Sequence, residues 1–175
     1  SVAAQPERTH VIGAYALGKA QRVIRLIREA GHDAPIYLHG AQEKLCAYYA
    51  GEGIDLGDLR KALDRDKAEF RGHIVIAPPS ALRDRWSRRL ADPVVCQASG
   101  WMTIRQRAKQ SGVELPLVIS DHADWNELTA TIGATGAETV WVTHGREEAL
   151  VHWCRQRGLK AEPLYMQGRE EDAGE

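Results

Sequence analysis

Short apolar stretches alternate with helix-like stretches along this sequence, and this alternation constrains its fold more than any other feature. Buried strands are expected at 9–15, 34–38, 73–77, 93–97, 115–119, 139–143 and 159–164. Amphipathic helices are expected between them, at 20–30, 41–50, 81–90, 124–132 and 147–156. Segment 54–71 is charged and only weakly periodic, and within it 61–69 is expected as a solvated helix face or a loop. Strands that alternate with helices are joined by crossovers and pair in parallel. The sequence therefore predicts an α/β fold, a largely parallel sheet flanked by helices.

Two of the predicted strands stop at a histidine and lead directly into a helix. One runs through 115–119 to Ser120, Asp121 and His122, and the other runs through 139–143 to His144. Open α/β sheets build their sites at the carboxyl ends of the strands. Imidazole is the side chain most often used for proton transfer and metal ligation near neutral pH. We therefore expect His122 and His144 to point from adjacent parallel strands into one cleft.

The composition excludes several classes of protein. The 175-residue chain has a formal net charge of −1, so a nucleic-acid partner would be held by local basic patches rather than a global field. Its three cysteines are far apart and odd in number, which argues against a disulfide framework and fits a reducing compartment. No apolar run is long enough to span a bilayer, and no signal-peptide pattern opens the chain. A cytoplasmic protein without a membrane partner is expected.

Four short motifs occur in an order that resembles a known family. They are 14–22 (AYALGKAQR), 98–102 (ASGWM), 120–125 (SDHADW) and 142–145 (VTHG). In this order and at this spacing they resemble the β-CASP nucleases of the metallo-β-lactamase superfamily. The bacterial ligase-associated DNA exonucleases, also labelled mRNA 3′-end processing factor-like, are the most similar group. The resemblance extends from about residue 8 to residue 164.

The resemblance implies a domain plan and a chemistry. Residues 1–116 would form the β-CASP cap, 117–165 the carboxy-terminal strand–helix return segment of a metallo-β-lactamase domain, and 166–175 a flexible acidic tail. His122 would contact the scissile phosphate and assist the leaving group, as the catalytic residue of this chain. His144 would ligate one of two zinc ions. The implied activity is that of a zinc-dependent phosphodiesterase, a DNA exonuclease that hydrolyses nucleic-acid ends.

The sequence lacks the features that proteins of this family carry in their first half. The H-x-H-x-D-H cluster that supplies most zinc ligands is absent, and no two of the seven histidines lie one residue apart. One histidine does not hold zinc at useful affinity, because zinc sites use several ligands. We therefore expect this chain alone to bind little or no zinc and to be inactive. The implied partners are the missing metallo-β-lactamase half, DNA or RNA, and functionally a DNA ligase.

Gly18 and Lys19 form one candidate phosphate-binding turn. They lie between a predicted strand and a predicted helix, where amide groups and a lysine side chain could face an anion. The pattern is not a Walker A loop, because the earlier glycine and the Ser or Thr after the lysine are missing. A plain tight turn is the competing interpretation.

Further candidates for contact with a nucleic-acid backbone follow the next strands. Ser99 and Gly100 open a turn that either offers phosphate-binding groups or is simply packed by Trp101. Ser120 precedes His122, and Arg105 begins a basic segment at 105–111 that is expected as a helix or a loop. Backbone binding by such groups would weaken as the salt concentration rises.

Two other functions remain open at this point. The chain could be a non-catalytic α/β module that binds nucleic acid or a protein partner, which the absent metal cluster favours. It could also be an unrelated nucleotide-binding domain in which Gly18 and Lys19 hold a nucleotide phosphate.

Overall fold

The computed structural model describes residues 1–63, 65–90, 92–144 and 147–164. The chain divides into two compact units, Ser1–Asp121 and His122–Glu175. The family resemblance predicts a boundary between 116 and 117 instead. The predicted tail at 166–175, and Gly145 of the fourth motif, lie outside the described residues. None of the helices in the described ranges is long and apolar enough to cross a membrane.

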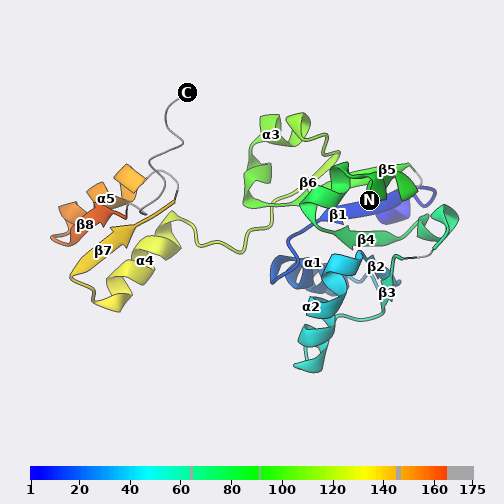
Figure 1. Ribbon diagram of the computed structural model, residues 1–175, viewed down its shortest axis with the longest axis horizontal. Helices are drawn as coiled ribbons and strands as arrows, with labels where there is room; N and C mark the ends of the chain where they lie inside the picture. The colour runs from blue at the N-terminus through cyan, green and yellow to red at the C-terminus, as the bar shows by residue number, and fades with distance from the viewer. Residues whose placement is uncertain (64, 91, 145–146, 165–175) are drawn as a thin grey trace. The chain divides into compact units, whose positions relative to one another are not determined.

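Unit 1 is built on a sheet of six parallel strands in the order β3-β2-β4-β1-β5-β6 (Figure 1). The strands are β1 (Thr9–Gly13), β2 (Ile36–Leu38), β3 (Leu59–Lys61), β4 (Ile74–Ala77), β5 (Pro93–Ala98) and β6 (Leu115–Leu117). Strand β1 is central, because Val11 pairs with Val75 on one side and Val95 on the other. The predicted parallel α/β fold is confirmed.

Helices and short 3-10 turns connect these strands. The α-helices of unit 1 are α1 (Lys19–Glu29), α2 (Gly40–Gly51) and α3 (Arg105–Gln110). The 3-10 turns are η1 (Val2–Ala4), η2 (Lys67–Phe70), η3 (Pro79–Arg83), η4 (Arg85–Arg89) and η5 (Gly100–Thr103). The prediction of an α-helix at 81–90 is wrong, because this segment forms the two 3-10 turns η3 and η4 instead. Turn η3 begins at a proline, and Asp84 both ends η3 and caps η4. The weakly periodic segment 54–71 contains the edge strand β3 and the turn η2.

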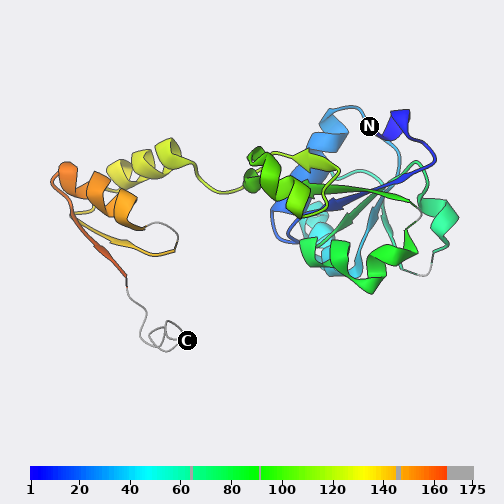
Figure 2. The ribbon, with the colours of Figure 1, turned by 90° about the horizontal axis from the view of Figure 1, so that it is seen from above.

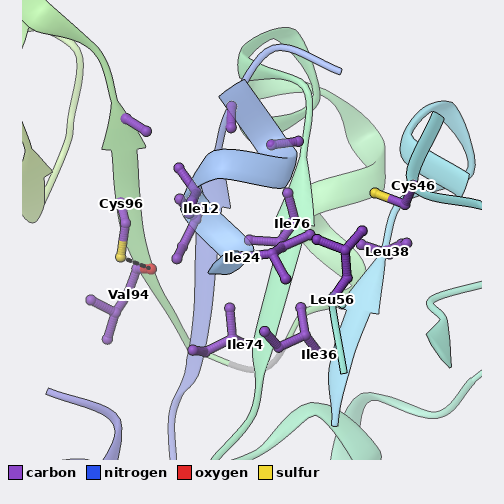
Figure 3. Close-up of a cluster of buried hydrophobic side chains, with 14 residues drawn as sticks. Ile12, Ile24, Ile36, Leu38, Cys46, Leu56, Ile74, Ile76, Val94 and Cys96 are labelled. Carbon is purple, nitrogen blue, oxygen red and sulfur yellow. Dashed lines mark hydrogen bonds between the residues drawn. The ribbon is translucent and has the colours of Figure 1, made fainter. Parts of the chain in front are cut away.

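Both faces of the sheet are buried, which follows from the alternation of side chains along each strand. Ile12 and Ile76 belong to the cluster beneath α1 and α2, whereas Val11 and Val75 belong to the cluster on the opposite face. Figure 3 shows Ile24 of α1 in one cluster with labelled side chains of β1, β2 and β4. Helix α1 has an apolar stripe along the side that faces the sheet, and the strands beneath it are almost continuously apolar. These two features account for the position of α1 against the sheet.

Unit 2 contains α4 (Trp125–Thr135), β7 (Thr139–Val142), α5 (Glu147–Gln156) and β8 (Lys160–Pro163). Strands β7 and β8 pair in parallel, and Figure 2 shows both helices on the same side of this small sheet. Helix α4 begins with a reciprocal capping pair: the Glu127 amide donates to Asp124 at 2.9 Å, and the Asp124 amide donates to Glu127 at 3.0 Å. Such reciprocal bonds satisfy amides that a helix start leaves unpaired.

Candidate functional site

The loops that follow β1, β5 and β6 form the candidate site of unit 1. These strands are neighbours in the parallel sheet, so their carboxyl ends share one edge. The predicted residues Gly18 and Lys19 follow β1, Ser99 and Gly100 follow β5, and Ser120 follows β6. The sheet therefore delivers these five residues to the edge at which open α/β sheets bind their ligands.

Gly18 is the central residue of a tight γ-turn. The Lys19 amide donates to the Leu17 carbonyl at 2.9 Å, and Gly18 has φ 76° and ψ −59°. This conformation is strained for any residue with a Cβ atom, which explains the glycine. The next amide, that of Ala20, donates to the Tyr15 carbonyl at 3.0 Å. Two amides at the start of α1 are thus used by the loop itself.

Lys19 is buried in an ion pair. Its Nζ lies 2.8 Å from Oδ1 of Asp121, and its side chain is 3% exposed while that of Asp121 is 33% exposed. The ammonium also lies 5.4 Å from the centre of the Tyr15 ring. A buried cation is tolerated when it is paired, and this pair joins the β1–α1 loop to the segment after β6. The role of Lys19 towards phosphate stays a prediction.

Ser120 packs directly against the turn that follows β5. A Cβ atom placed on Gly100 would lie 3.3 Å from both Cβ and Oγ of Ser120, closer than ordinary contact. Arg22 of α1 donates to the Ser120 carbonyl at 2.7 Å. Ser99 accepts a hydrogen bond from the Trp101 amide at 3.2 Å and so caps η5. Contacts thus bring the predicted residues of all three loops together.

Two buried glutamines position the β1–α1 loop, and the sequence reasoning missed both. The side-chain amide of Gln42 donates to the Ala14 carbonyl at 2.9 Å, and that of Gln21 donates to the Ala16 carbonyl at 3.0 Å. Both side chains are almost fully buried. Each glutamine occupies an inward-facing position of its helix, and this was the available signal in the sequence. A buried side-chain amide needs hydrogen-bond partners, and here the partner is a backbone carbonyl of the loop.

His122 and His144 belong to unit 2 and are both exposed. His122 is the first residue of that unit, and His144 follows β7 with a left-handed φ of 68°. The prediction that the two histidines end adjacent strands of one sheet is wrong. Strand β6 is the edge of the six-stranded sheet, whereas β7 pairs with β8 in a separate sheet. Two similar apolar runs predict strands, but they do not predict which strands pair.

The zinc ion implied by the family resemblance does not fit the described residues on their own. Within the described ranges, no three His, Cys, Asp or Glu side chains lie close enough to share a metal ion. A catalytic zinc site needs about three protein ligands. The ligand role of His144 therefore stays a prediction from the resemblance, and no step of a reaction follows from it.

The cysteines offer no reactive thiol to this arrangement, although the Sγ of Cys46 accepts a hydrogen bond from the Gln21 side-chain amide at 3.3 Å. All three are buried and free, as expected for small apolar residues. Burial raises the pKa of the Cys96 thiol to about 12, and burial also raises the pKa of Cys46. Neither thiol is therefore activated as a nucleophile or a metal ligand.

Comparison with known proteins gives one informative similarity. The chain is 29% identical over 151 residues to a protein from Opitutus terrae that is named "Probable DNA ligase". The alignment covers 86% of this chain but 14% of that relative, so the chain corresponds to a small part of its length. No family model matches the sequence. No solved structure matches it either.

Proposed function

We propose that this chain is part of an enzyme that processes DNA ends, and that it holds the sugar–phosphate backbone at the edge formed by β1, β5 and β6. The relative's name, DNA ligase, supports DNA as the polymer. The alignment covers only 14% of that relative. Its ligase name therefore supports a DNA-processing setting, and it does not support a ligase reaction for this segment. The proposed reaction of the complete enzyme is zinc-dependent hydrolysis of a phosphodiester bond.

The observation that carries this proposal is the contact between the loops after β1, β5 and β6. Ser120 lies against Gly100, and Asp121 pairs with Lys19. These contacts hold the three loops together, and a site that positions a reacting phosphate needs such support. Helix α3 follows η5 directly and carries Arg105, Arg107 and Lys109 without a carboxylate. Such a cationic helix beside the loops suits a polyanionic strand.

His122 and His144 enter the proposal through the family resemblance. His122 would contact the phosphate and give a proton to the departing oxygen, a role in which imidazole is the side chain most often used. His144 would be one of several ligands of a metal centre whose remaining ligands come from a further polypeptide segment. The described residues alone would then bind DNA without cutting it.

Fluorescence anisotropy with a labelled single-stranded oligonucleotide tests the binding part of the proposal. We expect the logarithm of the affinity to fall linearly with the logarithm of the salt concentration, by about 0.7 per phosphate contact. Arg105→Gln should lower this slope by about 0.7 to 1. Arg60→Gln is the matched control, because β3 lies at the opposite edge of the sheet. Absence of binding at about 50 mM salt, where backbone contacts are strong, would overturn the proposal.

The catalytic part is tested by co-expressing the chain with the metallo-β-lactamase half that the resemblance implies. The reconstituted protein should degrade DNA with zinc, and His144→Ala should lower both zinc content and activity. Undiminished zinc-dependent degradation by that variant would refute the metal-ligand role of His144. DNA binding without cleavage under any metal would instead favour a non-catalytic binding module.

A further inference from the structure

Trp101 is an exposed aromatic side chain in a turn that does not need it for packing. It lies on η5, directly after Ser99 and Gly100 of the candidate site, and is 58% exposed. The neighbouring Met102 is 5% exposed and packs with Ala108 and Val113. Met102 therefore anchors the turn, and the alternative in which Trp101 packs it does not agree with its exposure.

Trp101 is nevertheless held in place at both its backbone and its ring. The backbone amide of Trp101 donates to Oγ of Ser99 at 3.2 Å, and the guanidinium of Arg107 lies 3.9 Å from the centre of the indole ring. A guanidinium at this distance over an indole is a favourable cation–π contact. Since Arg107 covers one face of the ring, the 58% exposure lies on the opposite face and the edges.

The surroundings of the ring favour a nucleic acid over a protein partner. Arg105, Arg107 and Lys109 follow within one short helix that contains no acidic residue. The turn that carries Trp101 also carries Gly100, which contacts Ser120 of the proposed backbone-binding edge. An open aromatic face flanked by cations, beside the proposed backbone-binding edge, resembles the arrangement with which proteins hold single strands.

We propose that Trp101 and Arg107 form a stacking platform for one unpaired base of single-stranded DNA. This inference rests on the proposed function and adds to it a preference for single-stranded over duplex DNA. A base presents its π-face to a protein only when it has left the base stack, so the platform discriminates against duplex. Backbone contacts made by Arg105 and the loops would not discriminate in this way, because they carry no base information.

Anisotropy with two labelled probes of about twelve nucleotides, oligo(dT) and a blunt duplex of equal length, tests the platform. Trp101→Ala should weaken binding of oligo(dT) roughly 5- to 150-fold. Its effect on duplex binding should stay within about twofold. Trp101→Phe should retain much of the single-strand affinity, since a smaller ring still stacks. Trp141→Ala is the matched control, because Trp141 in unit 2 is also 58% exposed.

The outcomes separate this inference from the proposed function. If the wild-type chain binds both probes and Trp101→Ala weakens both equally, the platform is refuted while backbone binding stands. If Trp101→Ala changes neither affinity, the platform is refuted as well, and Trp101 becomes a candidate for a protein interface. If the wild-type chain binds neither probe, the proposed function itself fails. An unchanged far-UV circular dichroism spectrum of each variant excludes misfolding as the cause.

Discussion

Replacement of Gly18 by alanine isolates the energetic cost of the γ-turn at the start of α1. Gly18 has φ 76° and ψ −59°, and no heavy atom lies within 4 Å of the Cβ that alanine would add. The substitution therefore causes no clash, and its whole effect comes from the backbone conformation. Holding a non-glycine residue in such a region costs about 1–3 kcal/mol. This is a substantial part of a total stability of about 5–15 kcal/mol.

Urea unfolding followed by far-UV circular dichroism measures this cost. We expect Gly18→Ala to lower the unfolding midpoint without changing the slope, since the surface exposed on unfolding is the same. Gly40→Ala is the matched control, because Gly40 lies at the first position of α2 with open space and no left-handed φ. There alanine should stabilise by about 0.4–1 kcal/mol through the unfolded state. A Gly18→Ala variant as stable as wild type would refute the γ-turn assignment.

Two further predictions concern titratable groups. Because burial raises the pKa of Cys96 to about 12, its thiol should not react with Ellman's reagent at pH 8 until the chain is unfolded in guanidinium; rapid labelling of the native protein would contradict its burial. Arg8 holds Glu114 through bonds of 2.6 and 2.9 Å and lowers the pKa of that carboxyl. This contribution to stability is complete above the unfolded pKa of Glu114 and is lost as the pH falls through the lower folded value. Glu114→Gln should therefore destabilise at pH 7, and its effect should shrink as the pH falls below the ordinary pKa of 4.5. Equal urea midpoints of the two proteins at pH 7 would show that the ion pair contributes nothing.

Strands that are buried on both faces could be predicted from the sequence, and weakly buried ones could not. The stretch that became β4 (Ile74–Ala77) is apolar throughout and is buried throughout, so its identity was clear. Strand β3 (Leu59–Lys61) is an edge strand in which Arg60 and Lys61 are exposed, and its composition gave no strand signal. Parallel pairing with β2 creates β3, and pairing is a tertiary property.

The candidate site was predictable in its residues but not in its bonds. Gly18, Ser99 and Ser120 each follow a strand, and parallel strands must bring such residues to one edge. The ion pair of Lys19 with Asp121 joins residues that are far apart in sequence, so no local pattern encodes it. The separation of β6 and β7 into different sheets likewise depends on packing that periodicity does not report.

The central place of β1 in the sheet has a consequence for how the chain acquires its structure. Strand β1 precedes both of its partners in the sequence, and these partners, β4 and β5, end at Ala77 and Ala98. A ribosome adds about 5–20 residues per second, and it must synthesise the chain through β5 before β1 can pair with both neighbours. Until then its apolar edge remains available to chaperones or to other nascent chains. Pairings between such distant segments also slow refolding, because a long loop must close first.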